Sequence, residues 1–82
     1  MRVKGFVVDV KNDGADYYHK EAYDSREEAI KAVCDFIQER GEDCDLSEEE
    51  TSEFQKRFRK EAMDFAEPEI EVYGEIYSIA SV

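Results

Sequence analysis

Residues 25–41, SREEAIKAVCDFIQERG, contain the signals for a complete amphipathic helix. Ser25 and Glu28 form a capping box, in which the Ser25 hydroxyl accepts from the backbone N–H of Glu28 and the Glu28 side chain reaches back to Ser25. Apolar residues then recur at helical spacing and form one stripe, which comprises Ala29, Ile30, Val33, Cys34, Phe36 and Ile37. Gly41 is expected to end the helix at the C′ position, which favours a left-handed backbone.

A second helix is predicted from residue 47 to about residue 66. Ser47-Glu48-Glu49-Glu50 repeats the capping box. The apolar positions after it are four, four and three residues apart, as one face of a helix requires: Phe54, Phe58, Ala62 and Phe65. Pro68 ends the helix, because the residue before a proline is pushed out of helical geometry.

Strands are predicted on both sides of the helix pair. Residues 2–10, RVKGFVVDV, and residues 15–23, ADYYHKEAY, flank the turn signal Asn12-Asp13-Gly14 and form a hairpin. Residues 69–80, EIEVYGEIYSIA, are expected to form one continuous third strand. Its alternation places Ile70, Val72 and Ile76 on one face and Glu71, Tyr73, Glu75 and Tyr77 on the other.

The 82 residues therefore predict a single α+β domain spanning residues 1–82, with the order ββααβ and both helices on one face of a three-stranded sheet. The last strand can lie beside the first strand or beside the second, and the pattern does not distinguish the two arrangements. The opposite face would carry Tyr73 and Tyr77. Such a face is a binding surface, is covered by a homodimer through the sheet face or edge, or simply holds tyrosines because they suit a half-buried sheet.

The net charge of −11 arises from 22 acidic and 11 basic residues, and it is unevenly distributed. Residues 41–55 hold seven carboxylates and no basic residue, residues 56–60, KRFRK, hold four basic residues, and residues 61–82 hold six carboxylates and no basic residue. Acidic residues in the first turn of the second helix complement its dipole. Pairs of Glu53 with Arg57 or Lys56 are expected along that helix. Neither effect explains the carboxylates in the preceding loop or in the last strand.

These carboxylates predict a surface for a basic partner. Direct nucleic-acid binding is disfavoured, because phosphate contacts require lysine and arginine. An acidic array can instead imitate the phosphates of a nucleic acid and occupy a basic groove of a nucleic-acid-binding protein. The expected partner-binding residues are Glu42, Asp43, Asp45, Glu48, Glu49, Glu53, Glu69, Glu71 and Glu75, with Tyr73 and Tyr77 as apolar anchors. In size and charge alone, the chain resembles small acidic inhibitors of phages and mobile elements, including anti-CRISPR and anti-restriction proteins. The simpler alternative is that the acidity only aids solubility.

The chemistry of catalysis and metal binding is not indicated. Asp43, Asp45 and Ser47 match three positions of a calcium loop, but Glu48 and Phe54 stand where glycine and glutamate are required. One histidine and two cysteines are too few for a zinc site. We therefore predict no enzyme activity, no metal and no cofactor.

Two other functions remain open at this stage. One is a small regulatory or accessory module, antitoxin-like or docked to a larger subunit through an edge strand. The other is a small enzyme subunit, which a ligand pocket around His19 would favour.

The location of the protein is predicted to be cytoplasmic. Asp9 interrupts the apolar run that a signal peptide would need, and no apolar stretch approaches the length of a membrane span. Cys34 is expected in the core and Cys44 at the surface, both as reduced thiols.

Overall fold

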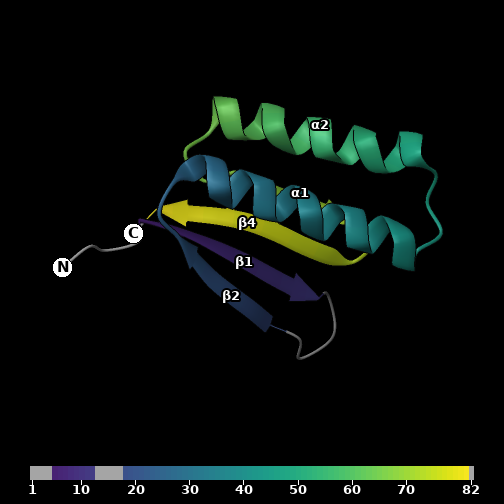
Figure 1. Ribbon diagram of the computed structural model, residues 1–82, viewed down its shortest axis with the longest axis horizontal. Helices are drawn as coiled ribbons and strands as arrows, with labels where there is room; N and C mark the ends of the chain where they lie inside the picture. The colour runs from purple at the N-terminus through teal and green to yellow at the C-terminus, as the bar shows by residue number, and fades with distance from the viewer. Residues whose placement is uncertain (1–4, 13–17, 82) are drawn as a thin grey trace.

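The computed structural model describes residues 5–12 and 18–81, which form two helices and a four-stranded antiparallel sheet (Figure 1). The elements in chain order are β1 (Phe6–Asn12), β2 (Tyr18–Tyr23), α1 (Arg26–Asp43), α2 (Glu48–Asp64), β3 (Glu69–Val72) and β4 (Glu75–Ser81). The α+β class is confirmed, but the order is ββααββ rather than ββααβ. The predicted turn at residues 12–14 lies mostly outside the described residues.

The segment predicted as one last strand is a hairpin of two strands, β3 and β4. Tyr73 and Gly74 have positive φ angles of 45° and 87°, the pattern of a two-residue type I′ turn. Val72 therefore pairs with Glu75 across the turn. Because the chain reverses at this turn, Glu75 lies opposite Val72 and on the same face of the sheet. The predicted orientations of Glu75, Ile76 and Tyr77 were therefore wrong. Tyr77 faces the helices and is 1% exposed, whereas Ile76 faces away from them.

The order of strands in the sheet is β2-β1-β4-β3, so the last strand lies beside the first. β4 pairs with β1 over its whole length, from Phe6 opposite Ser81 to Asn12 opposite Glu75. This resolves the alternative that the sequence left open. It also leaves β2 and β3 as the two edge strands.

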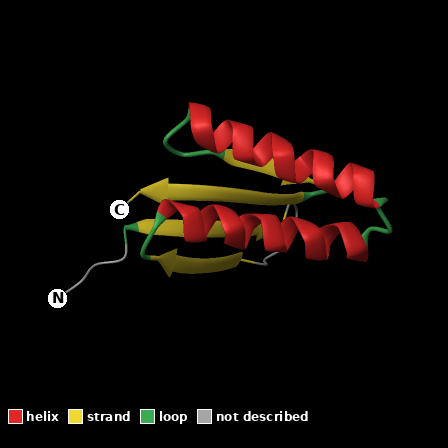
Figure 2. Ribbon diagram, turned by 45° about the horizontal axis from the view of Figure 1, so that its top comes forward, coloured by secondary structure: helices red, strands yellow, loops and turns green. Residues whose placement is uncertain are grey.

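Both helices pack on the same face of the sheet, as predicted (Figure 2). α1 lies over β1, β2 and β4, and α2 lies beside α1 and over β3. The core between the layers consists of Val8, Val10, Ala29, Val33, Ile37, Phe58, Ile70, Val72, Tyr77 and Ile79. The apolar stripes of the two helices thus supply one side of the core, and alternate residues of the strands supply the other.

The serine contact of each predicted capping box is confirmed at the helix N-termini. Ser25 and Ser47 each accept a hydrogen bond of 3.1 Å, from the backbone N–H of Glu28 and of Glu50 respectively. The end of α2 differs, because the helix stops at Asp64 and Phe65 is its C-cap. Phe65 was predicted to face the core and is instead 58% exposed.

Gly41 is not the C′ residue that the sequence predicted. It is buried inside α1, which continues to Asp43. A Cβ atom at Gly41 would overlap Thr51 Oγ1, so that one of the two residues would have to shift. The glycine is required because α1 and α2 approach each other closely at this point.

Candidate functional site: the acidic end

One end of the molecule gathers the last turn of α1, the connection between the helices, the first turns of α2 and the turn between β3 and β4. Seven carboxylates of this region are exposed, and we call them the acidic end: Glu42, Asp43, Asp45, Glu48, Glu49, Glu50 and Glu53. Among the ion pairs between described residues, none involves one of these seven. The region therefore presents a concentrated negative charge that the described part of the chain does not neutralise by pairing.

The connection between the helices has a defined backbone. Leu46 donates its N–H to the carbonyl of Gly41 at 2.8 Å, and Asp45 donates its N–H to the carbonyl of Glu42 at 3.3 Å. These two bonds are those of a Schellman motif, in which the residue at C′ is left-handed. Asp45 occupies that position with a φ of 56°. Asp45 thus has a structural role as well as a charge, since Asp tolerates this conformation better than most residues.

The first turn of α2 also has a structural reason to be acidic. Glu48, Glu49 and Glu50 lie there, and each is exposed. The N-terminal dipole of a helix stabilises such charges by about 0.3–1 kcal/mol each. The dipole does not reach Glu42 and Asp43, which lie at the C-terminal end of α1, where negative charge is unfavourable.

Tyr73 is an aromatic residue at the edge of the acidic end. It is 54% exposed, its hydroxyl donates to Glu50 Oε2 at 3.5 Å, and its ring meets the ring of Phe54 edge-on, with the centroids 6.1 Å apart. Arg57 covers Phe54, with the guanidinium carbon 5.7 Å from the ring centroid. An open hollow of about 220 Å³ lies between Glu50, Glu53, Phe54 and Arg57. The expected Glu53–Arg57 ion pair is not among the pairs between described residues.

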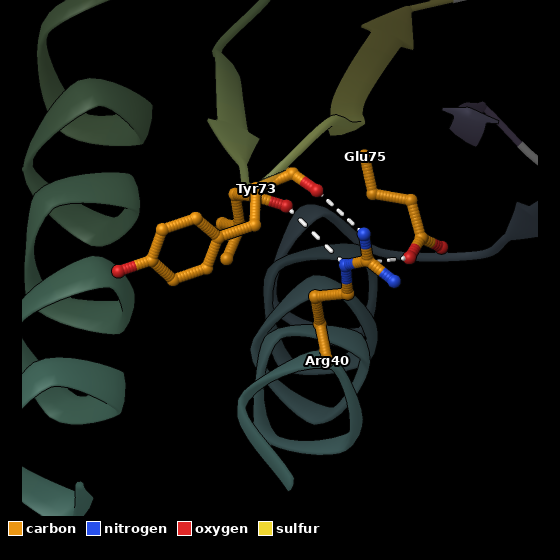
Figure 3. Close-up of polar contacts among 4 residues, drawn as sticks. Arg40, Tyr73 and Glu75 are labelled. Atoms are coloured by element: carbon orange, nitrogen blue, oxygen red, sulfur yellow. Dashed lines mark hydrogen bonds and ion pairs between the residues drawn. The ribbon is translucent and has the colours of Figure 1, made fainter. Parts of the chain in front are cut away.

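Arg40 fixes the turn that carries Tyr73 (Figure 3). Its Nε lies 3.0 Å from Glu75 Oε2 and donates to the carbonyl of Val72 at 3.4 Å, and its Nη2 donates to the carbonyl of Tyr73. The side chains of Arg40 and Glu75 are only 22% and 16% exposed. Glu75 is therefore paired within the chain, which corrects its prediction as an outward-facing binding charge.

The predicted binding residues thus fall into separate regions. Tyr73 joins the acidic end, whereas Tyr77 is buried and cannot anchor a partner. Glu69 and Glu71 are exposed on β3 and face away from the helices, because their cross-strand partners Ser78 and Ile76 do so. Sequence reasoning missed Arg40 and Phe54, because neither signals its role without knowledge of the β3–β4 turn.

The environments of His19 and Cys34 bear on the alternative of a small enzyme subunit. His19 Nε2 lies 3.5 Å from Glu21 Oε2, and the His19 ring packs edge-on against Phe36. Burial raises the pKa of the Cys34 thiol, and Asp35 adds to this shift while Arg59 opposes it. The hollow beside Phe36 measures about 150 Å³, well below the roughly 300 Å³ of a typical ligand pocket.

Two broader features concern metals and membranes. Within residues 5–12 and 18–81, no three His, Cys, Asp or Glu residues converge as ligands for a metal ion. Neither helix of this described part has the length and apolar character needed to cross a bilayer.

Comparison with protein families, with curated proteins and with solved structures finds no significant match to this chain. The functional argument therefore depends on the acidic end and on the surfaces around it.

Proposed function

We propose that the protein is a non-enzymatic binding protein whose acidic end occupies a basic, nucleic-acid-binding groove of a partner protein and blocks it. Several anti-CRISPR and anti-restriction proteins act in this way. The supporting observation is the seven exposed carboxylates of the acidic end, none of which belongs to an ion pair between described residues.

The spacing of these charges supports the proposal. Side chains three or four residues apart on a helix lie about 5–6 Å apart, as Glu49 and Glu53 do by their positions on α2. One strand of B-DNA presents a phosphate about every 3.4 Å along its axis. The two charge densities are of the same order, so a groove lined with lysine and arginine would attract both.

The energetics favour a partner for the acidic end. Seven like charges in one region oppose folding through mutual repulsion, and a basic groove would relieve that repulsion on binding. Because such attraction acts over a distance, it would mainly accelerate association and depend strongly on salt. Tyr73 would add an apolar contact at the margin of the charged surface, since about half of its surface is exposed.

The test uses the whole chain immobilised as bait for nucleic-acid-binding proteins from a cell lysate, washed at rising salt. A triple variant, Glu42→Gln, Asp43→Asn and Glu49→Gln, removes charge from the acidic end. A matched control, Glu27→Gln, Asp35→Asn and Asp64→Asn, removes the same charge from exposed positions elsewhere on the helices. We expect the unaltered chain to capture a protein that is released at high salt. The triple variant should fail to capture this protein, and the control variant should still capture it.

The decisive step measures DNA or RNA binding by the captured protein. Added chain should displace the nucleic acid, and the displacement should weaken steeply with ionic strength. If the captured protein binds nucleic acid equally well with and without the chain, the blocking function is wrong. If its affinity for the chain does not change with salt, the charge mimicry is wrong.

A second candidate function is that of a regulatory or accessory module that docks through an edge strand. The observation that favours it lies at β2, an edge strand beside a shallow hollow lined by Tyr23, Ala32 and Phe36 with Asp35 and Glu39. A partner strand added along β2 could place a side chain there. In that case the triple variant would bind its partner as well as the unaltered chain.

A further inference from the structure

The face of the sheet opposite the helices is a second surface, which we call the outer face. Cross-strand pairing arranges its residues in rows that run across the sheet. The first row contains Ala22, Val7 and Ala80, the second contains Lys20, Asp9, Ser78 and Glu69, and the third includes Lys11, Ile76 and Glu71. No helix covers this face in the described part of the chain (Figure 2).

The charges of the outer face are arranged by strand. The lysines lie on β2 and on its neighbour β1, whereas the two exposed glutamates lie on the opposite edge strand, β3. Between them the face is half-buried and small or apolar at Val7, Ala22, Ile76, Ser78 and Ala80. The face is therefore close to neutral overall and positive toward one edge, in a chain whose net charge is −11.

Asp9 lies in the middle of this face and has an unsatisfied atom. Its Oδ1 is buried and has no hydrogen-bond partner among the described residues. Buried polar atoms nearly always have a partner, so an unsatisfied carboxylate oxygen requires an explanation. Because this oxygen is already inaccessible in the single chain, it is not itself a contact for a second molecule.

We propose that the outer face binds the outer face of a second copy of this chain, about a two-fold axis that runs parallel to the strands. Such an axis reverses the order of the strands and keeps the rows opposite each other. β2 of one copy then lies over β3 of its partner, and β1 lies over β4. In the second row, Lys20 of each copy faces Glu69 of the other, and Asp9 of each copy faces Ser78 of the other.

The charges select this arrangement. A two-fold axis perpendicular to the strands would instead place β3 over β3 with the rows reversed, so that Glu69 would face Glu69 or Glu71 of the other copy, and like charges that face each other are destabilising. A strongly acidic chain can associate with itself only where its own charge is complementary. The outer face meets that condition, whereas the helix layer carries the acidic end on its surface.

The size of the interface sets the expected affinity. Four strands at about 4.8 Å spacing and seven residues at about 3.4 Å rise give a face of roughly 400 Å² per copy. The total is about half of the ~1,600 Å² typical of stable complexes, so we expect a weak dimer that forms in a concentration-dependent way.

The dimer would place both acidic ends at the same end of the assembly, because the axis runs along the strands. The two helix layers lie on the outside of the stacked sheets. Since sheets stack about 10 Å apart and a helix adds about 10 Å on each side, the acidic ends are separated by more than a Debye length. Their repulsion is therefore largely screened at physiological salt.

The test reverses charges in the second row and measures association of the whole chain by sedimentation equilibrium. The chain concentration reaches about 1 mM, which should exceed the dissociation constant of an interface of this size. Lys20→Glu or Glu69→Lys alone creates two like-charge contacts per dimer. Each single variant should weaken the dimer about tenfold or more. Lys20 and Glu69 stand on opposite edges of their own sheet, about 14 Å apart at three strand spacings, so one cannot compensate the other within a chain.

An equimolar mixture of the two single variants is the sharpest measurement. In the heterodimer, the glutamate introduced by Lys20→Glu in one chain faces the lysine introduced by Glu69→Lys in the other. The unaltered Lys20 and Glu69 face each other at the second contact, so both contacts are again attractive. The mixture should associate about tenfold or more tightly than either variant alone. The interaction that Lys20 makes within its own chain is lost in the Lys20→Glu chain whether that chain is alone or in the mixture, so its loss cannot produce the gain in affinity.

Two control variants distinguish this surface from the others. Lys31→Glu on α1 and Glu49→Lys at the acidic end reverse exposed charges away from the outer face and should leave the dimer unchanged. The proposal is overturned if the chain stays monomeric at about 1 mM, if the mixture associates no better than the single variants, or if a control variant weakens the dimer equally. Loss of partner capture in Glu49→Lys with an intact dimer would separate this proposal from the blocking function.

Discussion

Removal of the Arg40 side chain should destabilise the protein more than removal of any exposed charge. Arg40→Ala eliminates the contact with the Glu75 carboxylate and two hydrogen bonds to the carbonyls of Val72 and Tyr73. A hydrogen bond that involves a charged group contributes about 1.5–3 kcal/mol, and Glu75, whose side chain is 16% exposed beside Arg40, would lose its ion-pair partner. Allowing for partial exposure, we expect a loss of about 2–4 kcal/mol. For 82 residues, typical stabilities are about 4–12 kcal/mol.

The assay is urea unfolding followed by far-UV circular dichroism, because the chain contains no tryptophan. Arg40→Lys keeps the charge but not the fork of donors, so its loss should be intermediate. Glu75→Gln keeps an acceptor for Arg40 and should cost about 1 kcal/mol. Lys60→Ala, an exposed control on α2, should change the free energy of unfolding by less than about 0.5 kcal/mol. The reasoning fails if Arg40→Ala behaves like Lys60→Ala, or if Glu75→Gln costs as much as Arg40→Ala.

Three further predictions concern the helix contact, its connection and the core. Gly41→Ala should lower stability by about 1–2 kcal/mol, because the clash with Thr51 outweighs the helix preference of alanine of about 1 kcal/mol. Thr51→Ala should cost less stability in the Gly41→Ala variant than in the unaltered chain, and additive losses of the two substitutions would contradict the clash. Asp45→Gly should raise the melting temperature and Asp45→Ala should lower it, since both remove the charge but only glycine adopts the left-handed backbone freely. Burial raises the pKa of Tyr77 above the ordinary 10.0. The stability linked to this hydroxyl is complete below pH 10 and is lost as the pH rises above it. Tyr77→Phe should therefore show a shallower decline in stability between about pH 10 and 12 in unfolding experiments.

The helices could be predicted from the sequence because their signals are local. The capping serines and the apolar stripes act within a few residues, and both are found in the folded chain except at Phe65, which lies beyond the end of α2. Gly41 shows the limit of such signals. A glycine near a helix end usually marks the C′ position, but here the close approach of Thr51 from α2 requires it, and that contact is known only after the helices pack.

The four strands could not be predicted fully, because the decisive turn has an unusual sequence. A type I′ turn favours asparagine and glycine, and here its first residue is Tyr73, with a φ of 45°. The conformation is supported from outside the hairpin, by Arg40 on α1 and by Phe54 on α2. Tertiary contacts therefore stabilise the turn between β3 and β4. Because of this turn, Ile76 and Tyr77 lie on the faces of the sheet opposite to those predicted.

This turn changes the argument about the acidic residues. Glu75 is paired with Arg40, Asp45 occupies the left-handed position of the connection, and the first turn of α2 benefits from its dipole. Glu42, Asp43 and Glu53 have no such structural role in the described contacts, so the blocking function depends chiefly on them. Glu69 and Glu71 lie on another surface, where lysines of the same sheet provide complementary charge to a second copy. A charge reversal at the acidic end should therefore affect partner capture, and one on the outer face should affect dimer formation. The two effects should be independent, because additivity holds for sites that share no contacts.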